Sequence, residues 1–319
     1  MAGIPAALPP AAARSTAAVA PRQPPAAAAR ADAASSPAGW KLVWSDEFNR
    51  EGRPDPAKWT FEEGFVRNQE TQYYTRARRE NARVERGVLI IESRKERFPN
   101  AAYSAGSEDW RKKPQQAEYT SASLTTRGRA AWTYGRVEVR AKLPTGRGMW
   151  PAIWMLGTNI DKVGWPRCGE IDIMENVGFD PDVIHANIHT ESYNHVKRTN
   201  KGAPTRLESP HAGFHVYSME WTPERIDVFL DGRKYFTFAN EKTGTGAWPF
   251  DEPFYLILNS AIGGGWGGQK GIDDAIFPQR FEIDYVRVYQ RHPKEQAKGG
   301  RPGAAPRKAA PTGPRPVRP

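Results

Sequence analysis

Three carboxylates stand close together in the segment GEIDIMENVG, which covers residues 169–178. Glu170 and Asp172 alternate with isoleucines, so on a β-strand, whose side chains point to opposite faces in turn, they share one face. Glu175 is out of step and would point the other way on a regular strand. One extra residue would reverse the phase and bring it back. We therefore predict a β-bulge at residues 173–174 and three carboxylates on one face.

Two such carboxylates can cleave a glycosidic bond. In a retaining enzyme they lie about 5–5.5 Å apart, one acting as nucleophile and the other as acid and then base. The acid must keep its proton, and packing carboxylates together disfavours full ionisation of the group. A plain solvated strand face is disfavoured because no lysine or arginine is interleaved to offset the like charges. Trp150, Trp154 and Trp165 precede Glu170 by at most twenty residues, which is typical of a sugar-binding cleft.

The elements that must position these residues are strands. Period-two alternation predicts strands over residues 87–95, 135–143, 169–175, 182–190, 215–222, 225–238, 254–262 and 281–290. Asp231 and Gly232 supply a hairpin turn inside one of them. No convincing helical window of about 11 residues is present. The pattern predicts an all-β fold, with two large antiparallel sheets in jelly-roll style.

Composition divides the chain into a body and two ends. Residues 1–38 are rich in alanine and proline, and residues 292–319 in proline, lysine and arginine. We predict that both ends are disordered and that residues 39–291 form one domain. Residues 1–38 could be an export signal or a linker.

The net charge of +10 belongs mainly to the ends. Residues 291–319 hold eight basic residues against one acid, and residues 1–38 hold three against one, which leaves +1 for the body. The body therefore has no basic stripe that would bind nucleic acid. An alternative that stays open is a protein that binds nucleic acid through its basic ends. No run approaches the roughly 20 apolar residues of a membrane span.

Cys168 is the one cysteine, so no disulfide framework can form within a chain. It lies two residues before Glu170, and a catalytic cysteine–histidine pair is disfavoured because the carboxylates already supply a mechanism. A metal site is one interpretation of three nearby histidines, His185, His189 and His195. However, the first two are about 13 Å apart on a strand, and no adjacent acid completes a zinc site.

The segment EIDIME resembles the active-site signature of glycoside hydrolase family 16 in its bulged form, E-x-D-x-x-E. The resemblance continues through LVWSDEFN, NQETQYYT, GRVEVRAKLPTGRGMWPAIWMLG, HANIHT, FHVYSMEWTPERIDVFLDG, FYLILNSAIGGGWGG and FEIDYVRVYQ. These segments are similar to the bacterial laminarinase-like endo-β-1,3-glucanases. The resemblance implies a concanavalin-type jelly-roll sandwich with a substrate cleft on its concave face.

The resemblance also assigns roles by position. It implies that Glu170 is the nucleophile, Asp172 a helper between the two glutamates, and Glu175 the general acid/base. The substrate-binding residues that we expect are Asn68, Arg140, Trp150, Trp154, Trp165, His189 and Trp266. Arg140 could equally be an ordinary strand-face charge, and Trp154 could equally be core. A structural calcium in related enzymes matches Glu47, Gly87 and Asp284.

The expected function is that of a retaining endo-glycosidase acting on internal β-1,3 bonds of a laminarin-type β-glucan. Alternatives are a hydrolase or transglycosylase of the same family acting on mixed-linkage β-glucan, agar or another galactan, and a non-catalytic β-glucan-binding protein. We expect no cofactor for catalysis, a monomer, no membrane span, and a secreted or periplasmic location.

Overall fold

The computed structural model describes residues 36–291. The predicted disordered ends, 1–38 and 292–319, lie almost entirely outside the described residues. Their disorder, the export signal and the domain boundaries therefore stay predictions.

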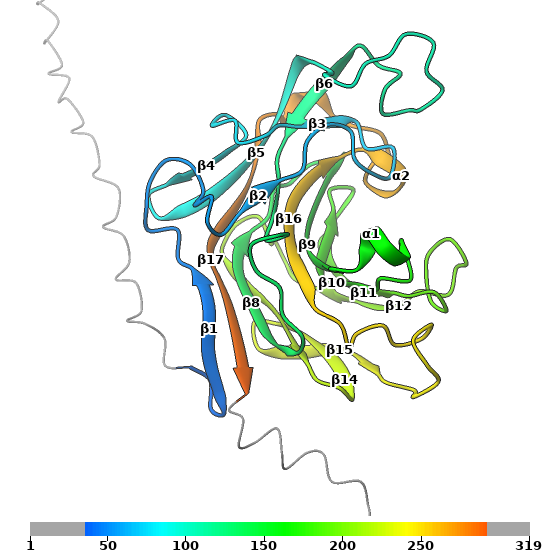
Figure 1. The fold of residues 1–319 in the computed structure, drawn as a ribbon. Coiled ribbons are helices and arrows are strands. Elements are labelled where there is room, and N and C mark those ends of the chain that lie inside the picture. The colour runs from blue at the N-terminus through cyan, green and yellow to red at the C-terminus, as the bar shows by residue number, and fades with distance from the viewer. Residues whose placement is uncertain (1–35, 292–319) are drawn as a thin grey trace, which may run out of the picture. The chain divides into compact units, whose positions relative to one another are not determined.

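The described chain folds into two β-sheets (Figure 1). The larger sheet contains β1 (Trp40–Asp46), β3 (Gln72–Tyr74), β4 (Ala82–Glu85), β5 (Val88–Pro99), β6 (Gln116–Ser121), β8 (Gly135–Lys142), β13 (His215–Trp221), β14 (Arg225–Leu230), β15 (Arg233–Ala239) and β17 (Gln279–Arg291). Its main path runs β15-β14-β13-β8-β17-β5-β6-β3, with β1 paired to β17 and β4 to β5.

The smaller sheet has the order β12-β11-β10-β9-β16-β7-β2. Its strands are β2 (Thr60–Phe61), β7 (Ser123–Thr125), β9 (Met149–Gly157), β10 (Glu170–Val177), β11 (Asp180–His189), β12 (Lys201–Arg206) and β16 (Phe254–Ile262). The helices are short: α1 (Ile160–Val163), α2 (Gly264–Gly267) and the 3₁₀ turn η1 (Asp274–Ile276). The prediction of an all-β sandwich is confirmed.

The strand pairings are antiparallel apart from one, in which β3 runs parallel to β6. The predicted hairpin joins β14 to β15, and both of its central residues have positive φ, 49° at Asp231 and 76° at Gly232. Asparagine, aspartate and glycine are the residues that tolerate this left-handed conformation best. The Asp-Gly pair therefore sets the turn locally.

The main core lies between the sheets. Apolar residues of alternate phase on β5 and β8, such as Leu89 and Val139, face apolar residues of β9 and β10, such as Met155 and Ile171; all four are fully buried or nearly so. The strand alternation thus sends one face of each sheet inward.

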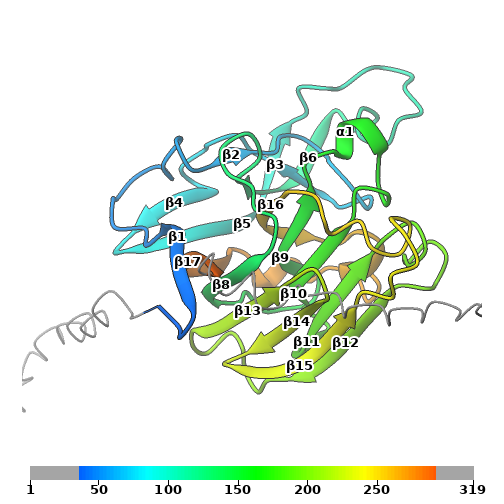
Figure 2. The same ribbon diagram turned by 60° about the horizontal axis from the view of Figure 1, so that its bottom comes forward.

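The other face of the smaller sheet carries a second apolar cluster of Ala152, Trp154, Leu156, Cys168, Tyr255 and Ile257. Helices α1 and α2 lie on this side of the sheet (Figure 1), and the turned view shows β9 to β12 side by side (Figure 2). A face with both apolar and polar residues on a strand row is suited to a ligand cleft.

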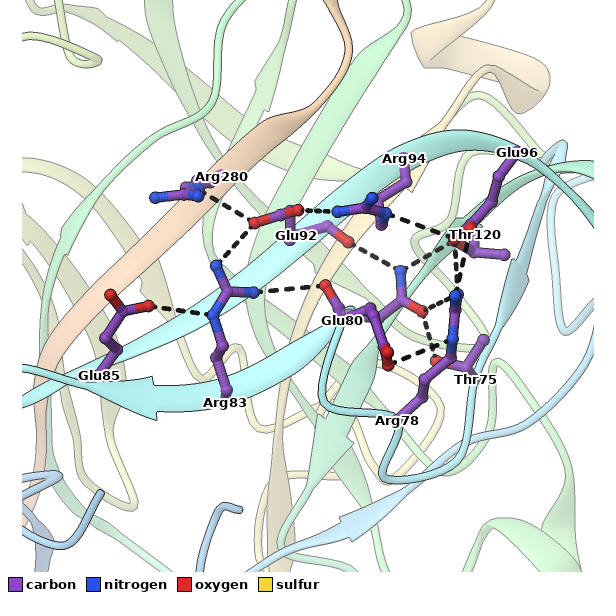
Figure 3. A network of polar contacts seen from close by, with 11 residues as sticks. Thr75, Arg78, Glu80, Arg83, Glu85, Glu92, Arg94, Glu96, Thr120 and Arg280 are labelled. Carbon is purple, nitrogen blue, oxygen red and sulfur yellow. Dashed lines mark hydrogen bonds and ion pairs between the residues drawn. The ribbon is translucent and has the colours of Figure 1, made fainter. Parts of the chain in front are cut away.

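The outward face of β4 and β5 carries a network of ion pairs (Figure 3). Its centre is Glu92, which is 2% exposed. Glu92 pairs with Arg83 at 2.8 Å, with Arg280 at 3.0 Å, and with Arg94. Three guanidinium groups therefore offset the cost of burying one carboxylate.

Candidate active site

Strand β10 carries the predicted bulge. Against β9, Asp172 pairs with Trp154 and Met174 with Ile153, so Ile173 is skipped. Against β11, the register shifts again between Asp172 and Glu175. Ile173 and Met174 are both fully buried, and consecutive apolar side chains can share the core face only if the phase slips between them. The bulge prediction is confirmed.

The bulge brings Glu170, Asp172 and Glu175 into one cleft. Further residues around this cleft are Glu62, Arg67, Asn68, Glu70, Arg111, Arg127, Trp150, Trp154, Trp165, His185, Asn187, His189, His195, Asn200, Tyr255, Asn259, Trp266 and Gln269. Burial raises the pKa of each of the three carboxyls, that of Glu170 to about 8 with a further contribution from the Asp172 charge. The cluster therefore retains protons at pH values where an exposed glutamate is fully ionised.

An indole N–H holds each of the two glutamates. Trp165 Nε1 donates to Glu170 Oε2 at 3.0 Å, and Trp150 Nε1 donates to Glu175 Oε1 at 3.0 Å. The two tryptophans predicted to bind substrate thus also orient carboxylates. Each indole leaves one oxygen of its glutamate for other partners.

Two asparagines that the sequence analysis missed support Glu175. Asn187 Nδ2 donates to Glu175 Oε2 at 3.1 Å, and Asn200 Nδ2 donates to Asn187 Oδ1 at 3.0 Å. Asn187 stands two residues before His189 in the segment HANIHT, so its strand phase was a usable signal. Asn200 lies before β12, in a connection that gives no such signal.

His189 lies beside Asp172 and Glu170. Its Nε2 is 3.3 Å from Asp172 Oδ2 and 3.7 Å from Glu170 Oε1. The β10–β11 register sets His189 opposite Glu170 and sets His185 opposite Glu175.

Ligand atoms of Glu170, Asp172 and His189 lie within 4.8 Å of one another, close enough to hold a metal ion. Acids therefore do lie beside His189, and the prediction that none does is wrong for this histidine. A metal ion there would occupy Glu170, one of the two carboxylates that glycoside chemistry needs free.

Another part of the cleft is built on Trp154, which is 5% exposed and belongs to the cleft-side cluster. Trp154 Nε1 donates to Asn259 Oδ1 at 2.7 Å, and the guanidinium of Arg67 lies 4.8 Å from its ring centre. Arg67 in turn forms an ion pair with Glu62. Arg67 therefore covers the ring of Trp154, and a substrate in this part of the cleft would contact Arg67 before Trp154.

Asn68 lies on the rim in the left-handed conformation, with φ 55°. Its Nδ2 donates to Glu70 Oε1 at 3.3 Å, and its carbonyl accepts from Gly265 N at 3.0 Å. That second bond ties the loop to α2, which presents Trp266. The ring of Trp266 lies edge-on to Trp150 at 5.7 Å. Five predicted cleft residues (Asn68, Trp150, Trp154, Trp165 and Trp266) thus line the cleft, as does His189.

Arg140 is not part of the cleft, and that prediction is wrong. It lies on β8 of the larger sheet, where Nη1 contacts Asp284 Oδ2 at 2.6 Å and the guanidinium packs over Phe214. Strand alternation showed that Arg140 faces away from the core, but it could not show which sheet the strand joins.

The predicted calcium ligands converge on one region, because Asp46 of β1 pairs with Val286 of β17, and Ile283 pairs with Leu89 just after Gly87. Two carboxylates and a carbonyl are the oxygen donors that calcium prefers. Here, however, Glu47 forms a double contact with Arg287 and Asp284 contacts Arg140. A calcium ion would have to displace both guanidinium groups, so this set stays a prediction.

Cys168 is fully buried in the cleft-side cluster. Burial raises the pKa of its thiol to about 12. A thiol that keeps its proton is a poor nucleophile, in line with our preference for carboxylate chemistry.

Comparisons with known proteins agree with the geometry. The family model described as glycosyl hydrolases family 16 matches residues 69–287. A β-glucanase from Rhodothermus marinus is 52% identical over 260 residues, covering 79% of this chain and 85% of that protein.

Two solved structures are similar in fold and in sequence. The laminarinase from Rhodothermus marinus has a TM-score of 0.72 at 52% identity and covers 79% of this chain and 98% of its own. A mutant of a non-specific endo-β-1,3(4)-glucanase, co-crystallised with 1,3-β-D-cellotriosyl-glucose, has a TM-score of 0.73 at 50% identity and covers 81% and 97%. The chain belongs to glycoside hydrolase family 16.

Proposed function

We propose that this protein is a retaining endo-glycosidase that hydrolyses internal β-1,3-glucosidic bonds of a laminarin-type β-glucan. One observation carries the proposal: the bulge in β10 sets Glu170 and Glu175 on the same face of one tryptophan-lined cleft. The similarity to laminarinases supports the choice of substrate.

In the first step, the ionised Glu170 attacks the anomeric carbon and forms an ester bond to it. The glycosidic carbon–oxygen bond breaks, and Glu175 gives its proton to the departing oxygen. In the second step, Glu175 removes a proton from water, the water oxygen attacks the same carbon, and Glu170 leaves. Two inversions give net retention of configuration.

The neighbouring groups suit these roles. Asp172 is 3% exposed and its charge raises the pKa of Glu170, so a proton is shared among close carboxyls before substrate binds. Trp165 and His189 lie on the Glu170 side of this group, while Trp150 and Asn187 donate to Glu175. The two glutamates therefore have different surroundings, as two different roles require.

Mixed-linkage β-glucan is the second candidate substrate, because the co-crystallised relative is named as a non-specific endo-β-1,3(4)-glucanase. A transglycosylase would use the same first step and differ in how well it excludes water. A protein that only binds β-glucan would have no need for the paired glutamates, both of which are present.

A reducing-sugar assay on laminarin, lichenan, agarose and xyloglucan separates these candidates. We expect new reducing ends from laminarin, with short oligosaccharides of several lengths, and first-formed products in the β configuration by NMR. Glu170→Gln is the control. Binding of laminarin without products would favour the binding protein, products from agarose alone would favour a galactanase, and longer oligosaccharides than those supplied would favour a transglycosylase.

We further propose that the enzyme acts outside the cytoplasm, since polymeric glucans are met there, and that it is a monomer without a catalytic cofactor. No helix among the residues with assigned positions is long and apolar enough to cross a membrane. Cell fractionation tests the location and light scattering the mass. Calcium bound at Glu47, Gly87 and Asp284 would raise Tm, and chelation would lower it.

A further inference from the structure

Strand β15, on the far side of the core from the cleft, contains a bulge of its own. Against β14, Phe236 pairs with Val228 and Lys234 pairs with Phe229, so Tyr235 is skipped. Lys234 contacts Asp227 on the outward face, whereas Tyr235 and Phe236 both pack against the core. The bulge therefore turns the Tyr235 ring inward, where a regular strand would give only one of the two neighbours that position.

The Tyr235 hydroxyl reaches the other bulge. Its Oη donates to the backbone carbonyl of Ile173, with 3.5 Å between the two oxygens, a long contact for a hydrogen bond. Ile173 is the extra residue of β10 and has no opposite residue in the β9 or β11 register. It is also fully buried. A buried carbonyl at a break in the ladder needs a partner from elsewhere, and a tyrosine hydroxyl can provide one.

The contact lies directly behind the candidate acid/base. Ile173 is two residues before Glu175, and the slip at Ile173 is what turns Glu175 into the cleft. Burial and the nearby charge of Glu175 raise the pKa of Tyr235, so its hydroxyl keeps its proton and remains a donor. Loss of that donor would leave the bulge free to relax toward a different backbone geometry.

We propose that Tyr235 is a positioning residue: its hydroxyl holds the β10 bulge in the geometry that directs Glu175 at the glycosidic oxygen. This inference rests on the proposed function, because it gives Glu175 the role of proton donor. It adds a contact between the two sheets to a site built otherwise from the smaller sheet and its loops.

The structure offers a matched control. Tyr217, on β13 of the same sheet, is 1% exposed, and its Oη has no hydrogen-bond partner among residues 36–291. Tyr217→Phe and Tyr235→Phe each remove one hydroxyl from a ring that packs against the core and keep that ring, so both variants should fold. Only the second loses a contact to the bulge.

The test compares kcat/KM on laminarin with kcat/KM on 2,4-dinitrophenyl β-laminaribioside. The dinitrophenolate leaving group of this second substrate needs no proton. Correct placement of a general acid contributes about 10²–10⁴-fold, and we expect Tyr235→Phe to lose at least about tenfold on laminarin. On the dinitrophenyl substrate we expect less than about a twofold loss. Tyr217→Phe should stay within about twofold of the wild type on both substrates.

Equal activity of the two variants on laminarin would overturn the proposal, as would an equal loss by Tyr235→Phe on both substrates. Inactivity of the wild type on every polymer would instead count against the proposed function. In that event, crystal structures of the wild type and Tyr235→Phe would still decide the positioning role. We expect the Glu175 carboxylate to be displaced in the variant, and an unchanged bulge and carboxylate would overturn it.

Discussion

The indole nitrogen of Trp165 donates a hydrogen bond to the Glu170 carboxylate, with 3.0 Å between the two atoms. A tryptophan at this place in a sugar cleft is expected to stack on substrate. Here it also fixes the candidate nucleophile and favours its ionised form, because a donated hydrogen bond stabilises a carboxylate more than a carboxylic acid. Under the proposed function, substrate stacking and control of the nucleophile would therefore depend on the same side chain.

Replacing Trp165 by phenylalanine keeps a ring but removes this hydrogen bond. The pKa of Glu170 should rise, so the acidic limb of the kcat/KM profile on laminarin should move to higher pH. Trp154→Phe is the control, because its indole donates to Asn259 rather than to a carboxylate. Identical acidic limbs in both variants would contradict this role of Trp165.

Glu170→Gln should reduce turnover of laminarin by at least about 10³-fold, or about 4 kcal/mol of transition-state stabilisation. Binding of laminari-oligosaccharides, measured by calorimetry, should remain, since the amide keeps the shape of the side chain. Normal activity in this variant would refute the assignment of the nucleophile.

The same variant should be more stable than the wild type near neutral pH. The pKa of Glu170 is raised to about 8 in the folded protein, so the folded state holds this proton more tightly than the unfolded chain. Between about pH 4.5 and 8 the unfolded chain loses this proton while the folded protein keeps it, and this difference lowers the free energy of unfolding as the pH rises. Glutamine cannot ionise, so we expect a gain of up to about 3 kcal/mol at pH 7 that disappears below about pH 4. Denaturant unfolding at the two pH values measures it, and an equal difference at both would exclude this cause.

Asp172→Asn should move the ionisation of Glu170 to lower pH. The Asp172 charge is the second contribution, after burial, that raises the pKa of Glu170. Asparagine removes the charge and keeps a polar group of similar size, so the acidic limb of the kcat/KM profile should shift downward. The total activity should fall as well, because the shared proton is lost. A limb that stays in place would show that Asp172 does not set this pKa.

Trp266→Ala should weaken substrate binding more than turnover. Trp266 lies against Trp150 and His185 at the cleft wall, and it is Trp150, not Trp266, that donates to Glu175. Loss of one aromatic surface corresponds to about 1–2 kcal/mol, so KM for laminarin should rise roughly five- to thirtyfold while kcat changes little. A fall in kcat at unchanged KM would place Trp266 in the chemical step instead.

Glu92→Gln should destabilise the fold without reaching the cleft. It leaves Arg83, Arg94 and Arg280 without their common carboxylate (Figure 3), and breaking a buried ion pair costs about 3–5 kcal/mol. The pKa of Glu92 is lowered in the folded protein, so its contribution is present above about pH 4.5 and lost as the pH falls through the folded value. Glu118→Gln is the control, since its pair with Arg97 is exposed and should be worth under about 1 kcal/mol. Equal Tm values for the two variants would contradict this.

The sequence by itself determined the features that follow from short-range pattern. Strand alternation predicted the all-β fold, and the out-of-step spacing of Glu175 after Glu170 and Asp172 predicted the bulge that sets the carboxylates on one face. The Asp231-Gly232 turn was visible because those residue types tolerate the backbone conformation that the hairpin requires.

The tertiary structure alone decided which strands are neighbours. A period of two says which residues share a face, but not which sheet the strand joins or which residue of the next strand lies opposite. Arg140 was therefore misplaced, and the contacts of Asn200 with Asn187 and of Tyr235 with Ile173 were not foreseen. The contact of Asn200 with Asn187 depends on which strands pair within the smaller sheet, and that of Tyr235 with Ile173 depends on the packing of the two sheets around a common core.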